Sequence, residues 1–459
     1  MRPHFTITLL KSGFATVALA VALFSYSPPG PPAHPTTTRS KPGSSASPVK
    51  KIALSKETTA CLECHQESAT PSATKQWAGS RHATAGVGCY ECHHAVKGSP
   101  TAFEHGGFSI TVLVSPKDCG QCHAKETREF EASHHAKAGE ILGSLDNVLG
   151  EVAEGIPAAN AGCKQCHGSK VKVLGNGKLD AATWPNTGIG RLNPDGSRGS
   201  CSACHSRHAF SASVARQPEN CGKCHLGPDH PQAEIYAESK HGIAFRAKIQ
   251  EMNLDSKSWV LGKDYSAAPT CATCHMSATS DLPMTHDVGA RISWTLRPEV
   301  SRKLENADAR RADMKKVCAN CHASDWVDNH YVQYDAVVHL YNDKFAIPAK
   351  AVMKKLRDAG KLTPTPFDEK IEWTYYELWH HEGRRARMGA AMMGPDYTQW
   401  HGFYEVAKNF YTEFLPEAEA LLPGVTAEVK AMDDHKWLQG LSPEERAKIE
   451  SFYQKRYGK

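Results

Sequence analysis

One five-residue pattern recurs eight times in this chain: two cysteines separated by two residues and followed immediately by a histidine. The sequence has 16 cysteines, so the eight copies use all of them. Thiols with this spacing bond covalently to the vinyl groups of haem c, and the histidine after them binds the iron. The pattern therefore predicts eight covalently attached haems. The copies, numbered as motifs 1 to 8, are Cys61-Cys64-His65, Cys89-Cys92-His93, Cys119-Cys122-His123, Cys163-Cys166-His167, Cys201-Cys204-His205, Cys221-Cys224-His225, Cys271-Cys274-His275 and Cys318-Cys321-His322.

Structural zinc is the main alternative use of paired cysteines. Zinc sites join cysteine pairs to one another, and they do not require a histidine directly after each pair. Here every pair has its histidine and no cysteine is left over, so haem attachment is the interpretation that accounts for the whole set.

The density of the motifs constrains the fold. Eight haems between residues 61 and 322 are too many for separate haem modules, so the cofactors themselves are expected to form the core. Only 40% of the residues are hydrophobic, which fits a chain without a conventional apolar interior. Strand signals are scarce. We expect a mainly α multihaem cytochrome c with its haems as the core, followed by a long-helix C-terminal region.

Four segments are expected along the chain. Residues 1–26 are predicted to be a signal peptide or N-terminal anchor, because the apolar run Ala15–Phe24 has the length of a secretory signal and is short for a membrane span. Residues 27–50, rich in Pro, Ser and Thr, are expected to be a disordered leader. The octahaem-binding region then covers residues 51–345. Covalent haem attachment needs an oxidising, extracytoplasmic compartment, so export is expected with or without cleavage of the N-terminal segment.

The last segment, residues 346–459, is predicted to be helical and to contribute the trimer contacts that are introduced below. One long helix is expected over residues 367–393 and a second from about Asp396 to Phe414. Ser442-Pro443-Glu444-Glu445 is a capping box with proline at the first helical position, and it predicts a last helix ending near Tyr457.

The formal charge of +5 does not indicate a nucleic-acid partner. Two propionates on each of eight haems would turn the balance into a net negative charge of about 11. Charged patches are expected to steer a redox partner instead.

Several histidines between the motifs are candidates for the sixth ligand of haem iron. Three segments, Trp77–His82, Phe130–His135 and Tyr236–His241, share the template of an aromatic residue, two residues, Ser, one residue and His, and Tyr376–His381 keeps the interval without the Ser. A repeated template implies a repeated task, and imidazole is a strong iron ligand. Surface histidines on polar helices are the alternative. The candidates are His82, His94, His105, His135, His208, His241, His286 and His381, with His134 and His380 as near-duplicates.

Three further positions attract attention. Asp229-His230 follows motif 6, Tyr265 precedes motif 7, and Tyr397 lies in the segment that follows the first long C-terminal helix. An acid next to a histidine near a haem can relay protons. A turn with a capping aspartate is the alternative for Asp229.

Taken together, the eight motifs, the segment Cys201–His208, the Asp229-His230 pair and the segment Met393–Tyr397 resemble the octahaem hydroxylamine oxidoreductase family. The similarity runs from about Cys61 to Phe414. It implies that the haem of motif 4 lacks a distal protein ligand and is the catalytic centre.

The resemblance also implies roles for single residues. Asp229 and His230 correspond to the acid and histidine of the family's distal pocket, and Tyr265 to its pocket tyrosine. Tyr397 corresponds to a tyrosine that bonds covalently to the catalytic porphyrin of a neighbouring subunit.

What the resemblance implies for function is a periplasmic homotrimer that oxidises hydroxylamine to nitric oxide or nitrite. Electrons would pass through seven bis-histidine haems to a soluble or membrane cytochrome c. A related hydrazine dehydrogenase producing dinitrogen is an alternative, and so is a reductase of nitrite or hydroxylamine, although Tyr397 argues against reduction. A non-enzymatic electron conduit with eight bis-histidine haems is the alternative of another class.

Overall fold

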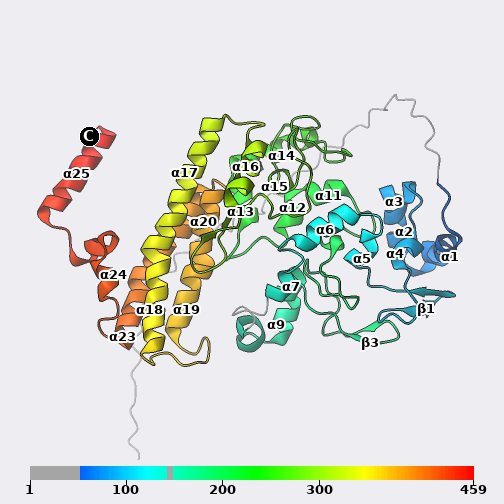
Figure 1. Ribbon diagram of the computed structural model, residues 1–459, viewed down its shortest axis with the longest axis horizontal. Coiled ribbons are helices and arrows are strands. Elements are labelled where there is room, and N and C mark those ends of the chain that lie inside the picture. The colour runs from blue at the N-terminus through cyan, green and yellow to red at the C-terminus, as the bar shows by residue number, and fades with distance from the viewer. Residues whose placement is uncertain (1–51, 142–147, 459) are drawn as a thin grey trace, which may run out of the picture. The chain divides into compact units, whose positions relative to one another are not determined.

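The computed structural model describes residues 52–141 and 148–458 (Figure 1). Helices dominate, and the strands of the described residues form three two-stranded hairpins. This confirms the predicted mainly α fold. The expected N-terminal segments, residues 1–26 and 27–50, lie outside the described residues. Within the described ranges, no helix is both long and apolar enough to cross a membrane.

The haem-binding region is built from short helices and loops. In motifs 2, 4 and 7 the five motif residues are themselves a helical turn: α4 (Cys89–His93), α10 (Cys163–His167) and α15 (Cys271–His275). Helical spacing places both cysteines and the histidine on one face, as attachment to one porphyrin requires. The other helices of this region are α1 (Lys56–Cys64), α2 (Pro71–Ala78), α3 (Arg81–Thr84), α5 (Pro116–Gly120), α6 (Ala124–Ala132), α7 (Ala138–Ile141), α9 (Ile156–Ala161), α11 (Ala212–Arg216), α12 (Pro218–Gly222), α13 (Gln232–Glu238), α14 (Lys240–Lys248) and α16 (Ala307–Cys318), with the single turns η1 (His65–Ala69), η2 (Val148–Ala153), η3 (Cys201–Ala203) and η4 (Ile249–Met252).

The three hairpins are small and antiparallel. They pair β1 (Phe103–His105) with β2 (Phe108–Ile110), β3 (Val173–Gly175) with β4 (Lys178–Leu179), and β5 (Trp294–Thr295) with β6 (Arg302–Lys303). Gly106 and Gly107 join β1 to β2 and both have positive φ, which suits the two-residue turn of a tight hairpin. This turn holds His105, at the end of β1, beside motif 1.

Three long helices follow the haem-binding region, and π-turns interrupt each of them. The second and third match the two predicted helices with shifted ends, at residues 370–391 and 395–421. The third continues beyond Phe414 because Leu415 and Ala418 are buried in the helical core. The elements are α17 (Ser324–Leu340), η5 (Tyr341–Ala346) and α18 (Ile347–Asp358); α19 (Lys370–Tyr376), η6 (Glu377–Glu382) and α20 (Gly383–Ala391); and α21 (Pro395–Thr398), η7 (Gln399–Tyr404), α22 (Glu405–Asn409), η8 (Phe410–Phe414) and α23 (Leu415–Leu421).

The first long helix, residues 324–358, crosses the boundary that we expected between residues 345 and 346.

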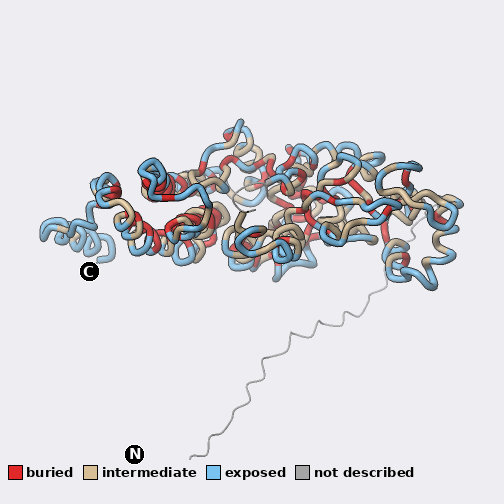
Figure 2. The backbone as a smooth tube through the Cα atoms, turned by 90° about the horizontal axis from the view of Figure 1, so that it is seen from below, coloured by how far each residue is buried: buried red, intermediate tan, exposed pale blue. Residues whose placement is uncertain are grey.

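The chain ends with α24 (Ala427–Ala431), η9 (Asp433–Gln439) and α25 (Pro443–Tyr457). The predicted capping box is present, because the Ser442 side chain accepts from Glu445 N and the Glu445 carboxylate accepts from Ser442 N. No residue of α25 is buried, and Figure 2 shows this helix exposed beside the C-terminal label.

The largest apolar cluster lies between the three long helices. Val352 and Leu356 of α18, Leu378 of η6, and Phe410 and Phe414 of η8 are almost completely buried in it. This cluster fixes η6, which carries His380 and His381, against the neighbouring helices. The C-terminal region thus has a conventional hydrophobic core, and the haem-binding region has a smaller buried cluster around Trp259 and Tyr265.

We predict that Gly383→Ala destabilises this bundle. A Cβ at position 383 would lie 2.7 Å from the Cζ and Oη atoms of Tyr341, a fully buried ring. The Tyr341 hydroxyl donates to Glu299 O and the Arg387 guanidinium covers the ring, so the tyrosine cannot move aside. Overpacking costs about 1–3 kcal/mol, which exceeds the ~1 kcal/mol that alanine gains over glycine in a helix.

Thermal unfolding followed by circular dichroism is the measurement, and a lower melting temperature is the expected result. Gly79→Ala is the matched control, because the nearest atom to its Cβ would be Gln76 O at 3.6 Å. Equal or higher stability of Gly383→Ala would show that Tyr341 is not held in place.

Candidate haem sites

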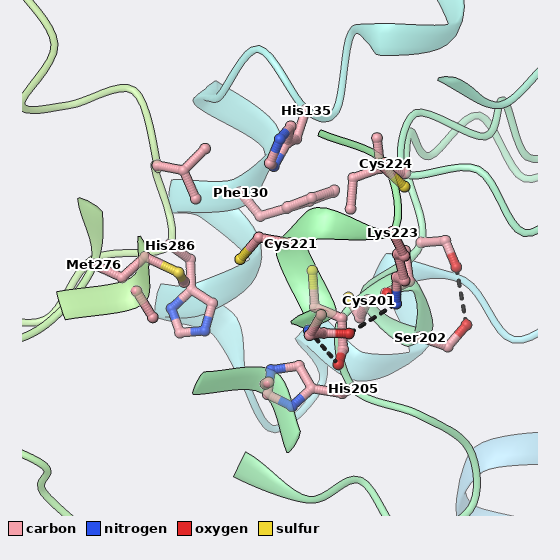
Figure 3. A pocket seen from close by; sticks show the side chains of 18 of the residues that line it. Phe130, His135, Cys201, Ser202, His205, Cys221, Lys223, Cys224, Met276 and His286 are labelled. Atoms are coloured by element: carbon pink, nitrogen blue, oxygen red, sulfur yellow. Dashed lines mark hydrogen bonds between the residues drawn. The ribbon is translucent and has the colours of Figure 1, made fainter. Parts of the chain in front are cut away.

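One cavity of about 3450 Å³ runs through the haem-binding region, and all eight motif histidines line it. Pockets for a single small ligand measure about 300–1,000 Å³. This cavity is several times larger, which fits a chain that encloses several large cofactors. The close-up in Figure 3 shows part of it, where His205, His286, Cys201, Cys221 and Cys224 come together from separate segments.

Imidazole rings face one another in pairs inside this cavity. Metal–imidazole bonds of about 2 Å on each side of an iron put the two ring centres about 6 Å apart. Six motif histidines have a candidate distal histidine at this spacing, so the donor set fits haem iron. The distances between ring centres are His65–His105 6.0 Å, His93–His208 6.4 Å, His123–His82 6.1 Å, His205–His286 6.5 Å, His225–His135 5.9 Å and His322–His241 6.1 Å.

Hydrogen bonds orient several motif histidines. His93 Nδ1 lies 2.8 Å from Thr111 O, and His275 Nδ1 lies 3.0 Å from Val288 O. A carbonyl only accepts, so each Nδ1 carries the proton and Nε2 is left to bind a metal. Burial also lowers the pKa of His205 to about 4 and that of His225 to about 3. These rings therefore stay neutral, as metal ligation requires.

The repeated template around the distal candidates is a bend between two helical segments. In each copy the serine is buried: Ser80 caps α3, Ser133 Oγ donates to Phe130 O, and Ser239 Oγ donates to Tyr236 O. Ser239 also accepts from Gly242 N at the start of α14. The serine thus satisfies the backbone at the bend, and the histidine two residues later projects from the new direction.

Two predicted distal histidines have other neighbours. The His94 ring lies 5.0 Å from Tyr90, and the His381 ring lies 5.2 Å from His380 and 5.6 Å from Tyr376. Neither forms a ring pair with a described motif histidine. His225 has a second ring neighbour besides His135, since His230 also lies 5.9 Å from it.

Neighbouring cysteines link the motifs in a definite order. Contacts run from motif 1 through motifs 2, 3, 5, 6 and 7 to motif 8, and motif 4 branches from motif 6. This order of neighbours differs from the order along the chain because motif 4 neighbours motif 6 and is not placed between motifs 3 and 5. The neighbouring cysteine pairs are Cys61–Cys89, Cys92–Cys119, Cys119–Cys201, Cys204–Cys221, Cys221–Cys271, Cys274–Cys318 and, for the branch, Cys166–Cys224.

Asp229 and His230 lie together on the cavity wall, directly after motif 6. Asp229 Oδ2 is 3.6 Å from His230 Nε2 and 3.3 Å from Arg384 Nη1. The Arg384 guanidinium also lies 3.0 Å from His380 Nε2, and its Nε and Nη2 donate to Arg297 O at 3.1 and 2.8 Å. A guanidinium only donates, so His380 Nε2 is the acceptor. Arg384 thereby joins the loop after motif 6 to the π-turn η6.

This group is rich in positive charge. Burial lowers the pKa of Arg297, and Arg384 lowers it further. Burial also lowers the pKa of His381 to about 4, with His380 adding to the effect and Asp229 opposing it. Arg297 and Arg384 both line the cavity, where they can attract a small anion, and Arg384 holds Asp229 in place.

Sequence reasoning missed Arg297 and Arg384. They lie far from Asp229 along the chain and belong to no recognised motif. Only the run of arginines after His381 marks this stretch as unusual, and it does not indicate which arginine reaches the cavity.

The two tyrosines occupy different surroundings. Tyr265 is only 4% exposed, stacks on Trp259 at 4.4 Å, and donates to Thr273 and Ser277. It does not belong to the described lining of the cavity, and its contacts are those of a packing residue. Tyr397 is half-buried at the start of the third long helix, where burial and Glu234 raise its pKa. It also lies outside the described lining.

Comparisons with known proteins agree with this geometry. The family described as "Seven times multi-haem cytochrome CxxCH" matches residues 194–367, and "Cytochrome c554 and c-prime" matches residues 33–94. The chain is therefore a multihaem c-type cytochrome with covalently bound haem, suited to redox electron transfer.

One curated relative is a probable nitrite reductase-hydroxylamine oxidoreductase fusion protein of Kuenenia stuttgartiensis, 26% identical over 337 residues. The match covers 59% of this chain, and the chain spans about a third (35%) of that relative's length.

Two solved structures share the fold. A hypothetical multiheme protein has a TM-score of 0.73 and 25% identity, over 84% of this chain and all of that one. A reducing HAO-like protein complex of Kuenenia stuttgartiensis has a TM-score of 0.59 and 20% identity, over 81% of this chain and 87% of that one.

We predict that His241→Ala adds one high-spin haem without lowering the haem count. His241 stands 6.1 Å from His322, so its removal opens one axial position at motif 8 while both cysteines remain. Electron paramagnetic resonance reports the spin state, and mass spectrometry of the denatured chain should still show eight haems. His94→Ala is the control and should leave the spectrum unchanged. High-spin signal in His94→Ala and none in His241→Ala would show that His94, and not His241, is a distal ligand.

Proposed function

We propose that this multihaem cytochrome is an octahaem oxidoreductase of small nitrogen compounds, and that its principal reaction is the oxidation of hydroxylamine at the haem of motif 4. The observation that carries the proposal is the position of the Asp229-His230 pair. It follows motif 6, whose Cys224 is a neighbour of Cys166 of motif 4, and it lines the common cavity. These acid-base groups support a catalytic centre at motif 4, where the family resemblance puts it.

The chemistry that needs these groups is a coupled loss of electrons and protons. Oxidation of hydroxylamine to nitric oxide releases three electrons and three protons. Bound haem supplies nitrogen binding and electron transfer. Asp229 Oδ2 and His230 Nε2 lie 3.6 Å apart, and the two groups accept protons. Arg384 holds Asp229 in the orientation that faces His230.

The remaining haems carry electrons away from the branch. The contact order of the motifs gives two routes from motif 6, one toward motif 1 and one toward motif 8. Electrons then pass to a cytochrome c acceptor, and the protein works in the periplasm as a homotrimer. Hydrazine is the alternative substrate of the same pocket, with dinitrogen as its product.

Reduction of nitrite is the second candidate. Arg297 and Arg384 make this part of the cavity cationic, which suits an anionic substrate. The name of the curated Kuenenia relative combines a nitrite reductase with a hydroxylamine oxidoreductase. Assays with hydroxylamine, hydrazine and nitrite, read by product identity, separate the three reactions.

Replacing Asp229 by Asn should slow hydroxylamine turnover by about 10²–10⁴-fold, the usual effect of losing an acid-base group. The haem count and the low-spin spectrum should stay the same, because Asp229 makes no bond to a motif residue. Asp358→Asn, an exposed residue paired with Lys354, is the control. Near-normal turnover of Asp229→Asn would reduce Asp229 to a turn residue.

Tyr397 tests the direction of the reaction. On the wild-type chain we expect a covalent link from Tyr397 to the motif 4 haem of a neighbouring subunit, so that boiling in detergent leaves a haem-containing trimer. Its half-buried position outside the cavity of its own chain supports contact with another subunit. Tyr397→Phe should release monomers, whereas Tyr404→Phe, a nearby exposed tyrosine, should not. Wild-type protein that runs as a monomer would favour the reductive alternative.

A further inference from the structure

A row of four aromatic rings runs along one face of α17. His322 of motif 8 precedes the helix, and Trp326, His330 and Tyr334 follow at intervals of four residues. Ring centres are 4.4 Å apart for His322–Trp326, and 6.4 Å apart for both Trp326–His330 and His330–Tyr334. The planes differ by 12°, 16° and 9°. Four-residue spacing brings side chains onto one face, and here the rings also lie almost parallel.

The side chains of this row are exposed near motif 8 and buried at the Tyr334 end. Trp326 is 43% exposed, whereas Tyr334 is 7% exposed and packs with Trp294 and Val338. Cys321 of motif 8 is exposed as well. Motif 8 also stands at one end of the contact order of the motifs. The first ring of α17 is therefore a surface residue in direct contact with the iron-binding histidine of a terminal haem site.

We propose that Trp326 is the electron port of motif 8, where electrons pass between this chain and a basic monohaem cytochrome c. The inference rests on the proposed electron-transfer role of the chain but not on its nitrogen substrate. One electron leaves the ferrous haem at motif 8 and reduces the ferric haem of the partner to the ferrous state. Trp326 is not oxidised in this step, and no proton moves.

The stacked indole shortens the path for this electron. Electron tunnelling falls steeply with distance through protein. At motif 8 the indole stacks on the imidazole of His322, which would bind the iron, and it also reaches the surface. A partner that contacts Trp326 is therefore separated from this imidazole by one indole ring. At motif 1, the other end of the order, the described ring contact of His65 is with His105 inside the cavity.

The surroundings of Trp326 suit a transient and basic partner. Asp325 and Asp328 are exposed beside it, and Asp328 binds Lys315 at 2.6 Å. Lys316 is likewise paired, with Asp313 at 2.8 Å. Both lysines are therefore offset by aspartates, which leaves an acidic excess around one exposed aromatic. Redox encounters use small interfaces of less than about 1,200 Å², and aromatic residues are enriched at their centres.

The test compares Trp326→Ala and Trp326→Phe with the wild-type protein. Each holoprotein is fully reduced with dithionite and mixed with an oxidised basic cytochrome c in a stopped-flow instrument. Affinity for the oxidised cytochrome is measured separately by surface plasmon resonance. Trp326→Ala should lower the electron-transfer rate and weaken binding by about tenfold or more, as expected for a central aromatic contact. Trp326→Phe keeps a ring that can stack on His322 and should retain most of both.

Two controls make the outcome specific. Trp373→Ala removes a similarly exposed tryptophan, at 40%, from α19 and should change neither quantity. Reduction of a small dye by the reduced protein should be the same in all variants, because a dye can reach other haems.

If Trp326→Ala disturbs the iron ligation at motif 8, new high-spin signal reveals it, and the Phe variant then decides. If Trp326→Ala transfers electrons to the cytochrome c and binds it as well as the wild-type protein does, and its spectrum is unchanged, Trp326 is not the electron port. Wild-type protein that does not turn over hydroxylamine would contradict the proposed function, and the result of the Trp326 test would stand independently of it.

Discussion

The spacing of paired imidazoles is the constraint on which the structure depends. An iron with two axial histidines requires ring centres about 6 Å apart, and six pairs in this chain meet that spacing. Each pair joins segments that are distant in sequence: the His93–His208 pair links α4 to the loop after motif 5, and the His123–His82 pair links the start of α6 to α3. Short helices and loops connect the pairs, and covalent haem attachment would add cross-links between them to the small buried cluster around Trp259.

The C-terminal helices follow a different principle. Their apolar cluster is conventional, and it gives η6 a rigid base close to the haem region. From that base Arg384 reaches Asp229, His380 and Arg297 O with one planar guanidinium. Arginine suits this position because its donors point in several fixed directions, whereas a lysine would offer a single point charge. The bundle therefore contributes to the candidate site as well as to stability.

The arrangement of the motifs gives the cavity a branched order. Among the described cysteines, Cys166 of motif 4 neighbours Cys224 of motif 6, and Asp229 and His230 follow motif 6 directly. The Asp229-His230 pair thus lies next to the motif at which the order of neighbours divides. At the far end of one route, motif 8 meets the surface through Trp326. This order of motifs does not favour electron flow in one direction over the other.

The sequence by itself determined the haem attachment sites and the mainly α fold, because each motif is local: five consecutive residues hold both thiols and one iron ligand. The capping box at Ser442 and the long C-terminal helices were predictable for the same reason, apart from helix ends that depend on packing, as at Leu415. Only the tertiary structure decided which imidazoles face each other. His94 and His381 looked equivalent to His105 and His241 in the sequence, yet they face Tyr90 and His380. Tyr265 stacks on Trp259 in a buried cluster. Arg384 approaches Asp229 across 155 residues of the chain, and such a contact depends on how the whole chain folds rather than on any local pattern.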